Sequence, residues 1–300
     1  MKVTVTGAAG VLGSGIVREV AAAGHTVQAV DLLPLPAEVA ETPGVEARQA
    51  HLADAAQARA AVADSEVVIH CAAVHPWKPY TDSQYWDLNV KSTHHVLAGC
   101  VAAGVQRVVF TSSVGPWAPF GRETLDLPLR EDVPPQPRDL YALTKWVGEE
   151  IAQWFWRVHR LRTLVLRPVA CMPLGDTWRE GVALLSGAWM HRADVIRAHA
   201  LAMEVDVPLE GVEACFLGPA VPYTPDEVIG ARRSLDAALA VYEQHFPGVA
   251  ALLQKRGVAP PRLAVVYSIE RAHHLLNWQP HHTFAAWYAA HCDEPVPGTA

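Results

Sequence analysis

The sequence predicts an α/β protein with a doubly wound parallel sheet and a smaller, discontinuous C-terminal part. Three observations support this class: the first half alternates short β-branched runs with segments of helical composition, a glycine-rich turn directly follows the first run, and polar residues gather where later runs end. Alternating strands and helices are typical of a parallel sheet covered by helices on both faces. Such a sheet binds its ligand beyond the carboxyl ends of the strands.

The expected strands are short alternating or apolar runs, at residues 2–6, 26–30, 46–51, 67–70 and 107–111. The expected helices are the segments of helical composition, at residues 14–23, 53–62, 88–103, 141–159 and 226–246. With 300 residues, of which 51% are hydrophobic and 18% are charged, the chain can bury a large core.

The stretch TGAAGVLG at residues 6–13 runs from the first expected strand into the first expected helix. Gly7 and Gly10 let backbone N–H groups approach a pyrophosphate without an intervening Cβ, and Gly13 lets the helix pack close to the strand. The helix N-terminus adds a partial positive charge. We therefore expect a dinucleotide, and the expected phosphate contacts are Gly7, Gly10, Val11, Leu12 and Gly13.

Asp31 ends the second strand, where a carboxylate accepts hydrogen bonds from both adenosine ribose hydroxyls and repels a 2′-phosphate. Its neighbours Leu32 and Leu33 carry no charge that could pair with such a phosphate, so NAD is expected rather than NADP. Leu52 and Asp54 follow the third strand. Asp54 either meets the adenine amino group or caps the helix that begins there.

Three small residues, Cys71, Ala72 and Ala73, follow the fourth strand. Small side chains at this position let the backbone approach the cofactor, and the alternative is that they fill the core.

Tyr141 and Lys145 are four residues apart and share one face of a helix, and Ser113 ends the fifth strand. Oxidation of a secondary alcohol requires a base for the hydroxyl proton, and a tyrosine with a pKa of about 10 is a poor base at neutral pH. A nearby lysine charge stabilises the phenolate. We expect Tyr141 to be the base, Lys145 its electrostatic partner and Ser113 the hydrogen-bond partner of the substrate oxygen.

The composition excludes several other kinds of partner. The net charge is −7 and the 24 basic residues are spread along the chain, so neither nucleic acid nor an anionic membrane is expected. The longest apolar stretches are too short to span a bilayer, and the chain begins with a strand rather than a leader peptide. Five cysteines without a Cys-x-x-Cys pair indicate reduced thiols. The sequence also lacks the His-Glu-x-x-His spacing that would indicate a metal site. We expect a cytoplasmic protein without a metal.

Together these motifs resemble the extended short-chain dehydrogenase/reductases, also called the NAD-dependent epimerase/dehydratase family, over nearly the whole chain. Residues 6–13 resemble the cofactor loop of that family, and residues 110–113 (FTSS) its catalytic serine segment, which favours Ser113 over Ser112. Residues 89–93 (NVKST) resemble its central-helix motif, in which Asn89 supports the helix geometry or a water relay. By resemblance the cofactor contacts also include Asn89, Thr111, Tyr141, Lys145 and Pro168.

The resemblance implies bound NAD and two domains. The NAD-binding domain would comprise residues 1–167, to which segments near 190–220 return, and the substrate-binding part would comprise residues 168–189 and 221–300. Members of the family frequently form dimers through two helices per subunit. We therefore expect a homodimer built through the helices that follow the fourth and fifth strands.

The substrate segment is short, because only 25 residues separate Pro168 from Asp194. Members that bind a nucleoside diphosphate carry a longer insert there, so a smaller substrate is expected. Residues 167–173 and 185–189 resemble the corresponding region of uronate dehydrogenases, although Val114 stands where those enzymes carry asparagine. The candidates for substrate contact are Ser113, His75, Trp117, Arg179 and Trp189. Aromatic residues that line the pocket or else fill the core are Trp117, Phe120, Trp178 and Trp189.

These observations predict an NAD-dependent oxidoreductase that removes hydride from a secondary alcohol of a small polyhydroxylated compound, a sugar or sugar acid. The first alternative is a sugar or nucleotide-sugar epimerase or dehydratase, in which the hydride returns to the substrate and NAD stays bound. The second alternative is a regulator that senses NAD and performs no chemistry. The intact set of Ser113, Tyr141 and Lys145 argues against that regulator.

Overall fold

The computed structural model describes residues 1–118, 126–205 and 211–292, and Phe120 lies outside these residues. The chain forms two compact units. Unit 1 comprises Met1–Ala118, Pro134–Pro168 and Val195–Cys215, and unit 2 comprises Pro119–Val133, Val169–Asp194 and Phe216–Ala300.

The units differ from the expected domains at residues 126–133, which belong to unit 2 although the sequence pattern assigns them to the NAD-binding domain. Backbone hydrogen bonds explain this difference. The N–H of Leu129 donates to the carbonyl oxygen of Val266 at 2.9 Å, and the N–H of Ser268 donates to that of Leu129 at 2.8 Å. That unit 2 binds the substrate stays a prediction.

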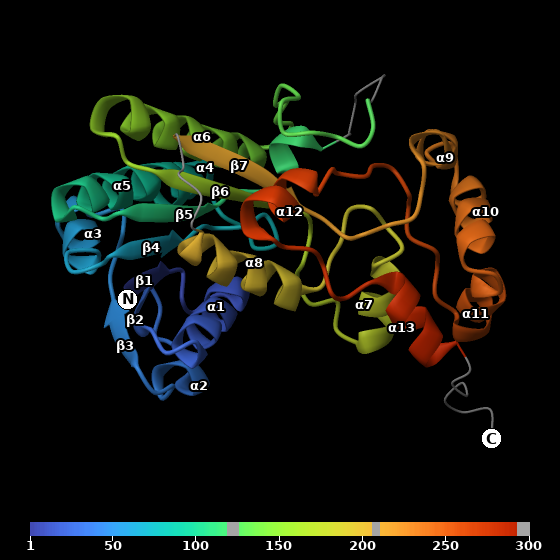
Figure 1. Ribbon diagram of the computed structural model, residues 1–300, viewed down its shortest axis with the longest axis horizontal. Coiled ribbons are helices and arrows are strands. Elements are labelled where there is room, and N and C mark those ends of the chain that lie inside the picture. Colours follow the sequence, from blue (N-terminus) through green and yellow to red (C-terminus); the bar gives the residue numbers. More distant parts are fainter. Residues whose placement is uncertain (119–125, 206–210, 293–300) are drawn as a thin grey trace. The chain divides into compact units, whose positions relative to one another are not determined.

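A seven-stranded sheet of order β3-β2-β1-β4-β5-β6-β7 is the framework of unit 1 (Figure 1). Its strands are β1 (Lys2–Thr6), β2 (Thr26–Asp31), β3 (Val45–Gln49), β4 (Val67–His70), β5 (Arg107–Thr111), β6 (Thr163–Pro168) and β7 (Val212–Leu217). The first six strands pair in parallel. The order reverses between β1 and β4, which confirms the doubly wound fold class. Arg167 and Pro168 are the last two residues of β6.

The helical elements of unit 1 are α1 (Val11–Ala22), α2 (Ala37–Ala40), α3 (Ala55–Ala61), α4 (Asp82–Tyr85), the π-helical turn η1 (Trp86–Lys91), α5 (Ser92–Ala103), the 3-10 turn η2 (Gly115–Trp117), α6 (Leu140–His159) and most of α8 (Arg192–Glu204). The expected helix at 88–103 therefore begins earlier, at Asp82, and contains a π-helical turn around Asn89.

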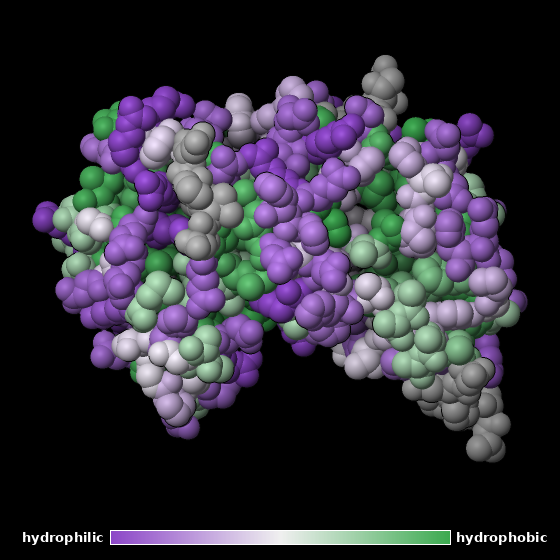
Figure 2. All heavy atoms as spheres, viewed as in Figure 1, coloured by the Kyte–Doolittle hydropathy of each residue, from purple (hydrophilic) through white to green (hydrophobic). Residues whose placement is uncertain are grey.

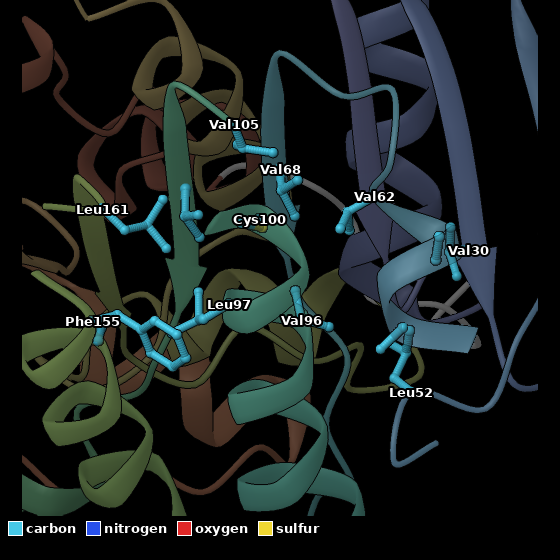
Figure 3. Packing of buried hydrophobic residues seen from close by; sticks show 14 of the residues in the cluster. Val30, Leu52, Val62, Val68, Val96, Leu97, Cys100, Val105, Phe155 and Leu161 are labelled. Carbon is cyan, nitrogen blue, oxygen red and sulfur yellow. The ribbon is translucent and has the colours of Figure 1, made fainter. Parts of the chain in front are cut away.

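Helices cover both faces of the sheet. On one face α3, α5 and α6 pack against the strands through apolar side chains such as Val62, Leu97 and Phe155 (Figure 3). On the other face α1 and α8 lie so close together that a Cβ atom on Gly15 would clash with Ile196. Strands β4 and β5 are short runs of mainly buried apolar residues because both faces of the sheet are covered there.

Unit 2 is mainly helical, with α7 (Thr177–Ala183), α9 (Pro225–Ala231), α10 (Leu235–His245), α11 (Val249–Arg256), α12 (Glu270–Leu276) and α13 (Phe284–His291). The expected single helix at 226–246 is wrong, because it is two helices. The chain turns at residues 232–234, and the side chain of Ser234 accepts the N–H of Ala237 at 3.0 Å, which starts a new helix.

Hydrophilic side chains cover much of the visible face, with smaller apolar areas between them (Figure 2). Among the described residues, no helix combines the length and the apolar character that crossing a membrane requires.

Candidate active site

The turn after β1 has the geometry of a phosphate-binding loop. Gly7 has a φ of +73°, and a Cβ atom there would lie 2.7 Å from the backbone nitrogen of Ala72, so only glycine fits. A Cβ atom on Gly13 would clash with the carbonyl oxygen of Gly7. The first turn of α1 has neither a capping side chain nor an acidic residue, which suits an anionic ligand. The expected phosphate contacts in this loop are Gly7, Gly10, Val11, Leu12 and Gly13.

Asp31 lies at the end of β2, and backbone groups hold both of its carboxylate oxygens. Oδ2 accepts the N–H of Ala9 in the glycine loop at 2.9 Å, and Oδ1 accepts the N–H of Leu33 at 2.9 Å. Each oxygen keeps a lone pair that can accept a ribose hydroxyl. Leu32 is exposed. The loop and the ribose candidate are therefore held together before any ligand binds.

Asp54 occupies the helix-capping role that the sequence leaves open. It precedes α3, and its Oδ1 accepts the N–H of Gln57 at 2.9 Å. This hydrogen bond is the main reason that the pKa of Asp54 is lowered. Leu52 is buried in the core, so only its backbone can meet a ligand. Contact with adenine stays a prediction, and Asp54 lines an open surface depression together with His51, Ala53, Gln57, Asp87 and Lys91.

The small residues after β4 lie where the strand order reverses. The N–H of Ala72 donates to Oγ1 of Thr6 on β1 at 3.3 Å. The Cys71 thiol lies 2.9 Å from Oγ1 of Thr111 on β5, and burial raises its pKa to about 11, so it is protonated at neutral pH. Ala73 is exposed. The side chains of Thr6, Cys71 and Thr111 thus link β1, β4 and β5 at the carboxyl ends of these strands.

Tyr141 and Lys145 lie one turn apart on α6. Lys145 is 4% exposed, and its Nζ donates to the carbonyl oxygen of Thr111 at 2.8 Å and lies 5.8 Å from the centre of the Tyr141 ring. Burial lowers the pKa of Lys145 to about 8, while Cys71 and Glu149 act in the opposite direction. Lys145 therefore keeps its charge at neutral pH, where the charge stabilises a phenolate.

Ser113 and Ser112 have different surroundings. Ser112 is 2% exposed, and its hydroxyl donates to Oε1 of Glu149. Ser113 is half-buried, and its Oγ accepts the N–H of Gly115 at 3.0 Å. A Cβ atom on Gly115 would lie 3.4 Å from Oγ of Ser113 and 3.4 Å from Cβ of Ala142, so Ser113 lies near the first turn of α6. This geometry favours Ser113 over Ser112 as the substrate partner.

Asn89 lies in the π-helical turn and is 3% exposed. Its Oδ1 accepts the N–H of Val74 at 2.7 Å, and its Nδ2 donates to the carbonyl oxygen of Val74 at 3.1 Å and to Oγ1 of Thr144 at 3.0 Å. Both amide hydrogens are therefore used. Of the two alternatives for Asn89, this arrangement favours structural support over a water relay, because it ties the loop after β4 to the turn of α6 that carries Tyr141 and Lys145.

Two further substrate candidates lie in unit 1. The ring of His75 lies 4.6 Å from that of Tyr141, and its buried Nδ1 has no hydrogen-bond partner among the described residues. Burial lowers the pKa of His75 to about 4, so the imidazole is neutral at pH 7. Trp117 is 2% exposed and stacks on the guanidinium of Arg167. The structure therefore places His75 beside Tyr141 and Trp117 in the core.

The other two candidates lie in unit 2. Arg179 is exposed and pairs at 3.3 Å with Asp176, the N-cap residue of its own helix. Trp189 is buried, and its Nε1 donates to the carbonyl oxygen of Met172 at 3.3 Å. Contact of either side chain with a substrate stays a prediction.

Sequence reasoning missed a buried ion pair and two buried histidines of unit 1. Arg167 pairs with Glu149 at 2.7 Å, His199 contacts Oγ1 of Thr111 at 2.8 Å, and His70 contacts Oγ1 of Thr6 at 2.7 Å. Burial lowers the pKa of His70 to about 3 and that of His199 to about 4, so both are neutral. Glu149 follows Lys145 by one helical turn, so the four-residue spacing in the sequence could have indicated that it lies near Lys145. No local sequence pattern marks His70 or His199 as members of the site.

Comparisons with known proteins show the family of the chain. Residues 3–172 match the profile of the NAD dependent epimerase/dehydratase family. A UDP-glucose 4-epimerase from Lactobacillus helveticus is 31% identical over 171 residues, which are 56% of this chain and 51% of that protein. A uronate dehydrogenase from Agrobacterium fabrum is 30% identical over 137 residues, which are 45% of this chain and 49% of that protein. The chain thus spans about half the length of the curated relatives it matches.

A solved structure of a short-chain dehydrogenase/reductase superfamily protein from Agrobacterium tumefaciens, with bound NAD, has the same fold. Its TM-score is 0.72 over 97% of this chain and 95% of that chain, at 20% sequence identity.

Proposed function

Because the chain belongs to the NAD dependent epimerase/dehydratase family, we propose that it transfers hydride between NAD and a secondary alcohol of a small polyhydroxylated compound. Family membership confirms the expected family, an enzyme and NAD as the cofactor. The similarity to a uronate dehydrogenase noted in the sequence is also confirmed. Net dehydrogenation, the substrate and the residue roles are proposals.

The residues of unit 1 fit NAD. The glycine loop has no room for a Cβ at Gly7 or Gly13, and the first turn of α1 offers uncapped N–H groups to a pyrophosphate. The Asp31 carboxylate is held beside the loop, where it would accept the ribose hydroxyls. When bound, NAD accepts the hydride.

The observation that carries the proposal is the buried ammonium of Lys145 beside the Tyr141 ring. This charge stabilises a Tyr141 phenolate, which takes the hydroxyl proton of the substrate as the C–H hydride leaves. Ser113 then hydrogen-bonds the substrate oxygen and keeps it in register. The balance is one alcohol and NAD⁺ converted to one ketone or lactone, NADH and one proton.

The size of the substrate is inferred from the short segment between Pro168 and Asp194. The match to a uronate dehydrogenase supports a free sugar acid or sugar, and the match to a UDP-glucose 4-epimerase supports the alternative of an epimerase. Both reactions use the same hydride step, and they differ in whether the hydride stays on the nicotinamide.

Incubation of the purified protein with free NAD and a panel of hexoses, hexuronic acids and a nucleoside diphosphate sugar tests the proposal. Accumulation of NADH with a hexose or hexuronic acid supports the dehydrogenase. An isomerised product without NADH contradicts net dehydrogenation and supports the epimerase. NAD binding without any product from the whole panel contradicts the proposed sugar chemistry and favours the regulator.

A further inference from the structure

A buried ion pair in unit 1 joins α6 to β6. Glu149 is 6% exposed and Arg167 is 7% exposed. One terminal nitrogen of Arg167 donates to Oε2 of Glu149 at 2.7 Å, and its Nε donates to Oε1 at 3.1 Å. The loss of hydration that two buried charges suffer offsets much of their attraction, so such a pair is weak evidence for stability. The groups that the pair holds in place indicate its role.

The pair holds the loop after β5 on both sides of Ser113. Before Ser113, the hydroxyl of Ser112 donates to Oε1 of Glu149 at 2.5 Å. After it, the Trp117 ring centre lies 3.7 Å from the guanidinium carbon of Arg167. Ser113 thus lies between two side-chain anchors, Ser112 on Glu149 and Trp117 on Arg167, and both belong to the same ion pair. Backbone hydrogen bonds also hold this segment, since the N–H of Ser112 donates to the carbonyl oxygen of Leu166 at 2.8 Å and that of Val114 to Pro168 at 3.1 Å. Loss of either side-chain anchor therefore loosens the position of the Ser113 hydroxyl without releasing the backbone.

Glu149 also affects Lys145, which precedes it by one helical turn. Burial is the largest influence on the pKa of Lys145 and lowers it, whereas Cys71 and Glu149 oppose that change. The other groups around Lys145 are Tyr141 on α6, Phe110 and Thr111 on β5, His70 and Cys71 at the end of β4, and His75 beyond it.

None of those other groups is an anion at neutral pH before the base forms. Burial raises the pKa of the Cys71 thiol to about 11 and lowers the pKa values of His70 and His75 to about 3 and about 4, so all three are neutral. Glu149 is therefore the carboxylate that favours the ammonium form of Lys145, and the charge of Arg167 moderates its effect.

We propose that Glu149 is a positioning residue, which holds the Ser113 loop through Ser112 and the Arg167–Trp117 stack and also stabilises the ammonium of Lys145 beside Tyr141. The inference rests on the proposed function, because it assigns Glu149 to the same hydride step.

The first test needs no substrate. The chain has five lysines, so ¹³C-lysine NMR of the full-length protein can follow each titration, with Lys145→Arg to assign the resonance of Lys145. We expect Lys145 to titrate at about 8 in the unchanged protein and Glu149→Gln to lower this value by about one pH unit, because the variant removes the neighbouring negative charge. Glu150→Gln changes the exposed neighbour on the same helix and leaves the titration unchanged. An unchanged titration in folded Glu149→Gln contradicts the electrostatic role.

The second test is kinetic and uses the sugar or sugar acid that reduces NAD. Glu149→Gln lowers kcat by about 10- to 100-fold, while the KM for NAD changes less than about threefold. Glu149→Asp restores the Lys145 titration but not the full kcat, because its shorter side chain keeps the charge and loses the reach to Ser112. A folded Glu149→Gln variant with unchanged kcat contradicts the positioning role.

If Glu149→Gln does not fold, Ser112→Ala tests the loop anchor, since it leaves the ion pair intact. A several-fold fall in kcat is expected, and an unchanged kcat contradicts the inference. Failure of the proposed function looks different, because the unchanged protein then transfers no hydride or Tyr141→Phe keeps full turnover.

Discussion

The ammonium of Lys145 and the carbonyl oxygen of Thr111 lie 2.8 Å apart, so one hydrogen bond ties the first turns of α6 to the end of β5. The hydroxyl of the same threonine contacts Cys71 and His199. Strands β4 and β5 and helices α6 and α8 therefore meet at one residue. This junction holds the ammonium of Lys145 beside the Tyr141 ring, which lies on the same helix.

Tyr141→Phe removes the proposed base and leaves the ring and its contact with His75. We expect kcat to fall by about 10²- to 10⁴-fold, because general base catalysis contributes an effect of that size. NAD affinity, measured by calorimetry, stays within about threefold of the unchanged protein. Tyr80→Phe, in the loop after β4, is the matched control and keeps its activity. Full turnover by Tyr141→Phe shows that another group is the base.

Asp31→Asn keeps a hydrogen-bond acceptor and removes the charge that repels a 2′-phosphate. The ratio of NADP to NAD dissociation constants is expected to fall by about tenfold, because one screened charge interaction is worth about 1 to 2 kcal/mol. Calorimetric titration with both cofactors measures this ratio. Tighter binding of NADP than NAD by the unchanged protein contradicts the role of Asp31.

Gly13→Ala places a Cβ atom against the carbonyl oxygen of Gly7, so the phosphate loop must shift. We expect NAD affinity to fall more than about tenfold and the free energy of unfolding to fall by about 1 to 3 kcal/mol. Gly230→Ala is the control, since no atom lies within 4 Å of its Cβ position in α9. That change should raise stability slightly. Normal NAD binding by Gly13→Ala contradicts the loop assignment.

Asp54 can be tested for its two roles separately. Asp54→Asn keeps a side-chain oxygen for the N–H of Gln57, whereas Asp54→Ala loses the cap. If Asp54 only caps α3, Asp54→Ala lowers the melting temperature and both variants bind NAD normally. If it also meets adenine, both variants bind NAD more weakly, because the carboxylate is absent from both.

The elements that the sequence predicts best are those with a local cause. The bounds of β1, β4 and β5 agree with the structure, because buried parallel strands are short apolar runs that end in turns. The glycine loop and the Tyr141–Lys145 pair are also local, since each depends on a turn or on one helical repeat.

The features that the sequence does not predict depend on distant residues. Asn89 clamps Val74 and Thr144, and the second of these lies 55 positions away. His199 reaches Thr111 across 88 positions. No periodicity encodes such contacts. The same holds for the expected homodimer through α5 and α6, which stays a prediction, although Trp154 and Val158 on α6 are 42% and 54% exposed.

Hydride transfer from the carbinol carbon is the central claim, and isotope tracing tests it most directly. The substrate that the panel identifies is prepared with deuterium on the reacting carbon and incubated with NAD and the full-length protein. We predict that the deuterium appears on the nicotinamide of NADH or, in an epimerase, is retained in the product. Product formation with loss of the deuterium to water contradicts the account.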